Sequence, residues 1–420
     1  MSACRTIIIL GLALLAAGGA TAGDFPAFSP PRPITSGPRE HLFASYYAIN
    51  SWSADGRYAL VLETDIKNRL PTEKDVAALG VVDLRDGNRF LPLTETRCWN
   101  FQEATMAHWL GNAPNDQFIY NDLVNGRFVA VIFDRQTRGK RIIPHPISAV
   151  SPDGREALSL NYARLRLTRP DYGYGGEGQN ARAETVWPED DGLFLVNLAT
   201  GEAKLIVSLA SVRDRMPPIK DPKGLAYFAH TVFSRDGRRI FWLARSVENL
   251  PGQKVVRQWQ TTAFTCNRDG GEVRRCFPDG WGGSHFNWLD GERMVVTAKY
   301  QDAVYSHIMF TPGRQDYQRL GMGLLDFDGH AVFSNDGRWM LTDTYPDRLN
   351  ERKLMVMRMA DQALLPLGTY YVPEEYREQY SRCDLHPRWR PDGRMIGFNS
   401  VHEGSRQVYV MEVSPPSQQP

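Results

Sequence analysis

The chain has 420 residues, of which 42% are hydrophobic, 11% aromatic and 23% charged, and its formal net charge is +1. Charges this closely balanced argue against the strongly basic surface that nucleic-acid binding requires. With 36 glycines and 27 prolines, the composition favours many short strands and tight turns over long helices.

The chain begins with a predicted secretory signal peptide at residues 1–22. Arg5 precedes the apolar run IIILGLALLAA, and small residues follow up to Ala22. The run is too short to span a bilayer, and its flanks are typical of a cleaved signal. Cys4 lies ahead of the run, where a lipid-anchor cysteine would not be. We therefore expect a secreted or periplasmic protein that has no membrane anchor after cleavage.

One pattern recurs along the rest of the chain: an apolar or aromatic residue, a few polar residues, Asp-Gly and an apolar strand. Its copies are WSADGRYALVL (52–62), VSPDGREALSL (150–160), FSRDGRRIFWL (233–243), WLDGERMVVT (288–297), FSNDGRWMLT (333–342) and WRPDGRMIGF (389–398), with a degenerate copy at 105–122. Most copies are followed by another strand that runs into a turn. Seven units of roughly 50 residues are typical of propeller blades, each a four-stranded antiparallel sheet.

We therefore predict an all-β fold, a seven-bladed β-propeller formed as one domain by residues 23–414, with 415–420 as a disordered tail. Six or eight blades would also fit, because the second unit is degenerate. The last unit ends at its third strand, RQVYVMEV, and so lacks an outer strand. We expect an N-terminal strand from the segment around HLFASYYAI (41–49) to supply it and close the ring.

The loop RPDYGYGGEGQN (169–180) contains a G-x-G-x-x-G pattern, but no strand precedes it and no helix follows it. Dinucleotide binding is therefore not supported. We interpret the segment as a long loop that carries Tyr172 and Tyr174 over one face of the propeller. Arg169 and Tyr174 are candidate substrate contacts, and we include them in the predicted catalytic site.

Four cysteines remain after the predicted cleavage: Cys98, Cys266, Cys276 and Cys383. An exported compartment permits disulfides. Cys266 and Cys276 flank a predicted hairpin, so they either form a cross-strand bridge or remain two buried thiols.

Four of the nine histidines occupy one position of the repeat. His230, His330 and His386 lie six residues before the Asp of their Asp-Gly turn, and His285 takes the same place in a unit one residue shorter. The aromatic packing position lies at an odd offset from them, so the histidines point to the other face of the strand. Because this strand borders the central channel, we expect the four imidazoles to converge on the axis. A single histidine there would more often be a core residue bonded to a backbone carbonyl.

Cys383 and His402 lie in the same blade as His386. Thiolate and imidazole together suit Zn²⁺ or another borderline divalent cation. We predict that His330, Cys383, His386 and His402 hold a divalent metal, and Zn, Mn and Ca all remain open.

The later blades resemble polysaccharide lyases built on seven-bladed propellers, chiefly the oligogalacturonate lyases and more loosely the ulvan lyases. The resemblance rests on SHFNW (284–288), GHAVFSNDGRWMLTDTYPD (329–347) and CDLHPRWRPDG with SVHEGSRQVYVMEV (383–413). It implies a base that takes the C5 proton of a uronic acid, while a cation or positive side chain neutralises the adjacent carboxylate. The 4-linked sugar then leaves by β-elimination.

The resemblance to the oligogalacturonate lyases places His285 at the base position and His330 and His386 at metal-ligand positions. Cys383 stands where those enzymes have a glutamine ligand, and Arg388 stands where they have a histidine. For the ulvan lyases, whose catalytic histidines come from an early blade, the matching segment offers Gln102, His108 and Asn121. Tyr345 and Asp347 in DTYPD either line the site or form a turn.

Two functional hypotheses follow. The first is an exported, monomeric lyase that acts on a uronate-containing oligo- or polysaccharide by metal- or arginine-assisted β-elimination. The second is a non-catalytic propeller that binds a protein or glycan partner, because the Asp-Gly blade pattern is shared with propellers of the TolB type. No G-x-S-x-G elbow supports a serine hydrolase.

Overall fold

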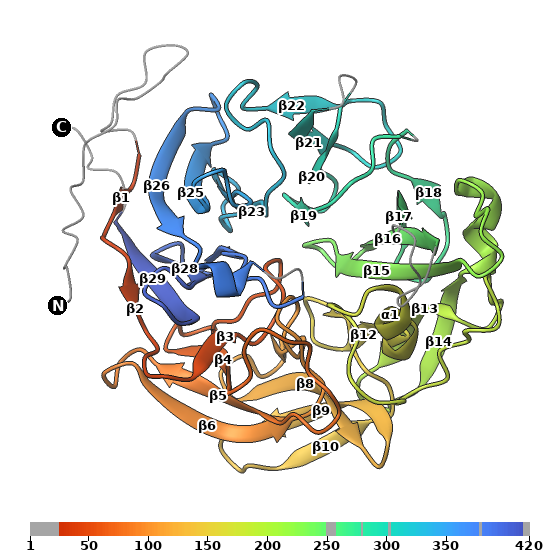
Figure 1. Cartoon of the computed structure of the whole chain (residues 1–420), viewed down its shortest axis with the longest axis horizontal. Helices are drawn as coiled ribbons and strands as arrows, with labels where there is room; N and C mark the ends of the chain where they lie inside the picture. The colour runs from red at the N-terminus through yellow and green to blue at the C-terminus, as the bar shows by residue number, and fades with distance from the viewer. Residues whose placement is uncertain (1–24, 249–257, 279, 301–303, 378–379, 415–420) are drawn as a thin grey trace.

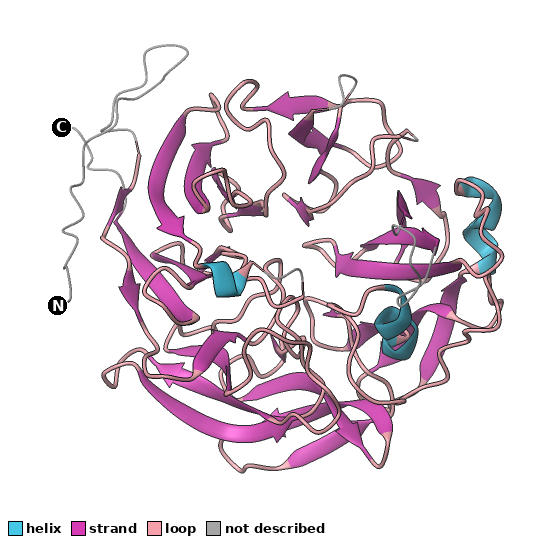
Figure 2. Ribbon diagram, viewed as in Figure 1, coloured by secondary structure: helices cyan, strands magenta, loops and turns pink. Residues whose placement is uncertain are grey.

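Six four-stranded sheets and one five-stranded sheet surround a central channel in the described part of the chain (Figure 1). The computed structural model describes residues 25–248, 258–278, 280–300, 304–377 and 380–414. The predicted signal peptide and C-terminal tail lie outside these residues. Strands dominate the fold, and short helical turns lie between them (Figure 2). The predicted all-β, seven-bladed propeller is confirmed.

The first six blades each contain four antiparallel strands, in chain order from the channel outward. Blade one contains β3 (Glu40–Phe43), β4 (Tyr58–Thr64), β5 (Ala77–Asp83) and β6 (Arg89–Thr96). Blade two contains β7 (His108–Trp109), β8 (Gln117–Val124), β9 (Arg127–Asp134) and β10 (Lys140–Ile143). Blade three contains β11 (Ala149–Val150), β12 (Glu156–Ser159), β13 (Gly192–Asn197) and β14 (Ala203–Ser208). Blade four contains β15 (Leu225–Phe233), β16 (Arg239–Glu248), β17 (Gln258–Asn267) and β18 (Arg274–Arg275). Blade five contains β19 (Phe286–Trp288), β20 (Met294–Lys299), β21 (Tyr305–Phe310) and β22 (Gln318–Leu320). Blade six contains β23 (Val332–Phe333), β24 (Trp339–Asp343), β25 (Glu351–Arg358) and β26 (Leu364–Tyr371).

The seventh blade combines both ends of the described chain. It contains β27 (Arg388–Trp389), β28 (Met395–Ser400) and β29 (Gln407–Ser414), and both β1 (Ala27–Phe28) and β2 (Arg32–Pro33) pair with β29 at its outer edge. The segment around 41–49 does not take this place, so that expectation was wrong. Residues 41–43 pair with β4 as part of the innermost strand of blade one, because the turn of that unit is preceded by an insertion. The insertion, residues 44–51, projects into the channel and carries Tyr46 and Tyr47.

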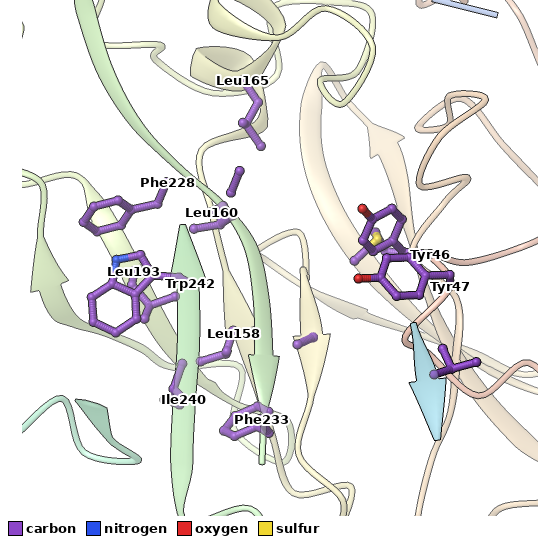
Figure 3. Close-up of a cluster of buried hydrophobic side chains, with 14 of the residues drawn as sticks. Tyr46, Tyr47, Leu158, Leu160, Leu165, Leu193, Phe228, Phe233, Ile240 and Trp242 are labelled. Atoms are coloured by element: carbon purple, nitrogen blue, oxygen red, sulfur yellow. The ribbon is translucent and has the colours of Figure 1, made fainter. Parts of the chain in front are cut away.

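The aromatic position of the repeat packs between blades, as its spacing predicts. Trp52, Phe233, Trp288, Phe333 and Trp389 are all buried. The turns after Trp52, Phe233 and Phe333 are each pinned by a serine whose hydroxyl donates to the turn aspartate, for example from Ser234 to Asp236 at 2.6 Å. Figure 3 shows how Phe233, Ile240 and Trp242 of blade four pack against Leu158 and Leu193 of blade three.

An insertion in blade three carries α1 (Tyr162–Thr168). Two short 3-10 helices lie elsewhere in the described chain, η2 (Ala210–Arg215) after blade three and η3 (Glu374–Tyr376) after blade six. The Asn161 side chain caps α1 by accepting a hydrogen bond from the backbone of Arg164. The buried Arg164 guanidinium donates to carbonyls of the insertion and to Ala226 of blade four, which fixes the insertion against that blade. None of the helices in the described part of the chain is long and apolar enough to cross a membrane.

Cys266 and Cys276 are free, buried thiols. In the β17–β18 pairing Phe264 lies opposite Arg275, so the two cysteines point to opposite faces of the sheet. Cys266 therefore joins the core cluster that contains Trp242, and Cys276 joins the one that contains Trp288. Of the two alternatives for this pair, the structure has the buried thiols.

Candidate active site on the channel axis

Three of the four repeat histidines meet on the axis. The ring centroids of His285 and His330 lie 3.9 Å apart, and those of His330 and His386 lie 4.3 Å apart. His230 lies on the other side of Tyr46, whose ring is 5.3 Å from the rings of both His230 and His386. All four histidines are buried. The predicted convergence is therefore observed, with a tyrosine between the fourth imidazole and the other three.

The inserted tyrosines support this cluster from within the channel. Tyr46 and Tyr47 lie side by side with ring centroids 4.5 Å apart (Figure 3). The Tyr47 ring lies 4.9 Å from that of His330, and its hydroxyl donates to the carbonyl of Phe286 at 2.6 Å. The segment 44–51 thus fills space that would otherwise leave the imidazoles without packing partners.

Two of the histidines have an unusual backbone. His230 and His386 have φ values of +55° and +46°, in the left-handed region that residues with a Cβ rarely adopt. Such a conformation costs about 1–3 kcal/mol and is concentrated at functional sites. At His386 the backbone amide donates to Asp343, whose carboxylate also receives the backbone amide and Nδ1 of His330. Asp343 therefore fixes two of the imidazoles at once.

His285 has the geometry of a general base. Its Nδ1 lies 2.9 Å from Oδ1 of Asp328. Burial alone would raise the pKa of Asp328, but the His285 ring and the hydrogen bonds from His285 and Thr297 bring it to about 2. Because an ionised carboxylate can only accept, Nδ1 carries the ring proton and Nε2 keeps its lone pair. Nε2 faces the hydroxyl of Tyr345 at 3.5 Å.

Burial lowers the pKa of His285 below its ordinary value of 6.5, and the neighbouring His330 lowers it further, while Asp328 opposes both effects. The imidazole is therefore neutral at neutral pH. A neutral imidazole with an unprotonated Nε2 and an ionised carboxylate behind Nδ1 can abstract a proton.

His330, Asp384 and His386 form a group that could hold a cation, with ligand atoms all within 4.8 Å of one another. His330 directs Nδ1 to Asp343 at 2.8 Å, which leaves Nε2 available. Nε2 of His386 is buried without a hydrogen-bond partner, and it lies 3.8 Å from Oδ2 of Asp384. Two imidazole nitrogens and a carboxylate oxygen suit a borderline divalent metal.

Asp384 is shared with two arginines. Arg352 lies 2.6 Å from its Oδ1 and Arg382 lies 2.9 Å from its Oδ2. Burial would raise the pKa of Asp384, but these two positive charges hold it well below its ordinary range. The residues therefore fit a divalent cation, but the two guanidinium groups weaken the attraction of the carboxylate for it.

Cys383 and His402 are not brought to this group. The Cys383 side chain lies in a cluster with Val372, Tyr376 and Val401, and burial raises the pKa of its thiol to about 11. Nδ1 of His402 pairs with the Ser400 hydroxyl at 2.8 Å. A thiol that remains protonated in an apolar cluster is a packing residue. Asp384, the next residue in the chain, lies where the sequence predicts Cys383.

A pocket of about 240 Å³ opens beside His285. It is lined by two histidines, two tyrosines, three arginines and a serine: His230, His285, Tyr172, Tyr345, Arg169, Arg245, Arg382 and Ser284. The positive lining suits an anionic ligand. The predicted contact Arg169 lies here, and so does Tyr345, so DTYPD contributes to the site, while Asp347 accepts backbone hydrogen bonds from its own turn.

The three arginines differ in their partners. Arg169 forms two hydrogen bonds to Asp171, at 2.8 and 3.1 Å, and Arg382 pairs with Asp384. In the described part of the chain, no carboxylate lies within ion-pair distance of Arg245, although its residue is only 7% exposed. A buried guanidinium without a counter-ion is costly unless a ligand supplies one. Arg245 is therefore the strongest candidate for a carboxylate receptor.

Tyr174 is not brought to the pocket. It is fully buried, its ring stacks on Tyr162 at 4.4 Å, and its hydroxyl accepts a hydrogen bond from Asn121. Tyr172 instead faces the site, with its ring 4.8 Å from that of His230. The side chains of Tyr172 and Tyr174 point in different directions because Gly173, between them, packs closely against α1. A Cβ on Gly173 would lie 2.2 Å from the backbone nitrogen of Arg166.

The residues that match the ulvan lyases do not line the pocket beside His285. Nδ1 of His108 pairs with the carbonyl of Met106, and burial lowers the pKa of His108 to about 4. It lines a second cavity of about 430 Å³, which shares His230 and Tyr172 with the pocket beside His285. Gln102 donates to the carbonyl of Arg382 and Asn121 to that of Ile147. Arg388, which stands where the oligogalacturonate lyases have a histidine, is buried and donates to Ser51 at 2.6 Å. These contacts are structural.

Sequence reasoning missed four residues that define the site: Arg245, Asp328, Asp343 and Asp384. Arg245 had a signal, because it interrupts the apolar strand RIFWLARSVE (239–248). Asp328 and Asp384 each lie two residues before a motif histidine, and Asp343 is the first residue of DTYPD (343–347), but nothing in their spacing marks the direction of their side chains.

Comparison with known proteins is informative for the fold. No family model and no curated protein matches the sequence. An oligogalacturonate lyase from Vibrio parahaemolyticus superposes with a TM-score of 0.62 at 15% identity, over 92% of this chain and 97% of that one. The chain has the fold of the oligogalacturonate lyases. A second such lyase, in complex with manganese, gives 0.61 at 16% identity, over 94% and 98% of the two chains. TolB from Acinetobacter baumannii gives 0.41 at 14% identity, over 87% and 82%.

Proposed function

We propose that the protein is a lyase that cleaves uronate-containing oligo- or polysaccharides by β-elimination. One observation carries the proposal: His285, backed by the ionised Asp328, opens into the same pocket as Arg245, a buried arginine without a carboxylate partner in the described part of the chain. A base and a carboxylate receptor in one pocket are what the removal of a proton next to a carboxylate requires.

In this mechanism the uronate carboxylate binds to Arg245, which offsets its charge and makes the C5 proton more acidic. Nε2 of His285 takes that proton, the C4–C5 double bond forms, and the C4–O bond breaks. The hydroxyl of Tyr345, 3.5 Å from Nε2, donates its proton to the leaving oxygen and regains one from His285. Burial raises the pKa of Tyr345 well above its ordinary value, so the phenol is protonated and can serve as the acid.

A divalent cation would be held by His330, His386 and Asp384, and it would supply further positive charge toward the uronate carboxylate. Arg169 and Arg382 add positive charge at the pocket wall. Because each already has a carboxylate partner, their role is to attract and orient the anionic chain.

Export completes the proposal. The predicted signal peptide at 1–22 would deliver the protein to the periplasm or the medium, where polymeric uronates occur. We expect the mature protein to be monomeric.

The experiment is a substrate panel. The purified protein is incubated with oligogalacturonate, ulvan and other uronate polymers, and the ultraviolet absorbance of the unsaturated product is followed. We expect one substrate to respond, His285→Ala to abolish the response, and His145→Ala, a partly buried histidine outside the channel, to retain it. A panel without product would remove the lyase proposal and favour the non-catalytic binding propeller.

A further inference from the structure

His230 is the one histidine of the repeat position that the proposed elimination does not use. It lies in a bulge of β15 between Ala229 and Val232, where its backbone takes the left-handed conformation. Its ring is enclosed by Tyr46 and Tyr172, at centroid distances of 5.3 and 4.8 Å. A strained backbone that places a buried imidazole at the wall of a pocket calls for a role.

The two nitrogens of His230 face different partners. Nε2 lies 3.4 Å from Nη1 of Arg245. Nδ1 lies 3.3 Å from Oε1 of Glu103, within ion-pair distance but without hydrogen-bond geometry. A guanidinium can only donate, so Nε2 must accept, and the ring proton must therefore be on Nδ1, toward Glu103. Glu103, His230 and Arg245 thus form a chain that runs from the segment between blades one and two to the middle of blade four.

Arg245 depends on this chain for its orientation. Its other contact is from Nη2 to the carbonyl of Gly283 at 3.4 Å, and its Nε has no hydrogen-bond partner. Both acceptors that hold the guanidinium are neutral. A carboxylate in the place of His230 would hold the group more tightly but would also cancel the charge that a ligand carboxylate needs.

The protonation states agree with this arrangement. Burial, followed by the positive charges of Arg245 and Arg169, lowers the pKa of His230 well below its ordinary value. Burial raises the pKa of Glu103 to about 8. At neutral pH the imidazole is uncharged and the carboxyl is largely uncharged, so the charge of Arg245 remains available to a ligand.

We propose that Glu103 and His230 are positioning residues that aim Arg245 at the carboxylate of the substrate while leaving its charge uncompensated. The proposal rests on the proposed function, because it assigns the aim of the arginine that the elimination requires. Neither residue takes part in proton transfer to or from the sugar.

The first test is a double-mutant cycle on oligogalacturonate, or on the uronan that the panel identifies. His230→Leu removes the acceptor and is expected to lower kcat/KM by about tenfold or more, since hydrogen bonds to charged groups are of that size. His230→Gln and Glu103→Gln keep an acceptor oxygen and should stay within about threefold of the wild type, whereas Glu103→Leu should resemble His230→Leu. The decisive variant combines His230→Leu with Arg245→Ala. Its kcat/KM should be no lower than that of Arg245→Ala alone.

If the fold-losses in kcat/KM of the two single variants multiply in the double variant, the proposal is overturned, because His230 then acts independently of Arg245. Failure of the glutamine variants to rescue activity at unchanged thermal stability would do the same. His145→Leu is the matched control and should equal the wild type.

A second test needs no substrate. In protein labelled with ¹⁵N-histidine, His230 should be the neutral Nδ1–H tautomer at neutral pH, assigned by its loss in His230→Gln, and Arg245→Ala should shift its signals while those of His145 stay. An Nε2–H tautomer or an imidazolium would refute the positioning chain even if lyase activity is found. If no uronan is cleaved, the proposed function fails, and the NMR result still decides how Arg245 is held.

Discussion

Replacing Asp328 by Asn tests the proposed base most sharply. The substitution keeps an oxygen that can accept from Nδ1 of His285, 2.9 Å away, but removes the negative charge. Charge-assisted hydrogen bonds are stronger than neutral ones, and those to charged groups contribute about 1.5–3 kcal/mol. The imidazole becomes positive in the transition state. If most of this hydrogen-bond stabilisation is lost there, kcat should fall about 10- to 150-fold.

The dependence of activity on pH tests the protonation state of His285. His285 must be neutral to accept the proton, so activity should rise with pH through a value below 6.5 and then level off, because burial lowers the pKa of His285. Asp328 is one of the groups that oppose this lowering. In Asp328→Asn the pKa of His285 should fall further, and the acid limb should move to lower pH.

The assay is the initial rate of unsaturated product as a function of pH, with Asp86→Asn, an exposed aspartate of an outer turn, as the matched control. An unchanged kcat, or an acid limb that moves to higher pH, would refute the assignment of His285 and Asp328.

Three further predictions address the other parts of the site. Arg245→Lys keeps the charge but not the planar fork, so kcat/KM should fall by at least tenfold, with a larger fall in Arg245→Ala, as measured by steady-state kinetics. Metal analysis of protein purified without a histidine tag should find a divalent ion that His330→Ala and His386→Ala lose and that Cys383→Ala retains; equal loss in Cys383→Ala would contradict the placement of its thiol in an apolar cluster. Asp384→Asn leaves Arg352 without its buried partner and should destabilise the fold by about 3–5 kcal/mol in denaturant unfolding, whereas Asp86→Asn should have little effect.

The fold could be predicted because its signal is repeated. Each Asp-Gly turn fixes the register of two strands, and the alternation of side chains then places the aromatic residues between blades and the histidines toward the channel. His285, His330 and His386 share this register and converge, although each lies one or two residues before the innermost strand of its blade and is held there by Asp328 or Asp343. The position of the ring closure was harder to predict, because the 44–51 insertion separates the strand of blade one from its turn.

The irregular segments account for what the sequence did not reveal. Residues 383–387 belong to no strand, so alternation cannot say which of Cys383 and Asp384 faces His386. The same holds for Tyr172 and Tyr174, whose directions are set by packing of the loop against α1. Arg245 does lie on a strand, but its importance comes from the absence of a carboxylate partner among the described residues, which is a property of three-dimensional neighbours.

The central claim is that the pocket eliminates and does not hydrolyse. The most direct measurement is to digest the responsive uronan in H₂¹⁸O and analyse the products by mass spectrometry and proton NMR. The account predicts a vinylic C4 proton on the new non-reducing end and no ¹⁸O fixed in the cleaved bond. Saturated ends that carry ¹⁸O would show that water is the nucleophile, and the roles given to His285 and Arg245 would then be wrong.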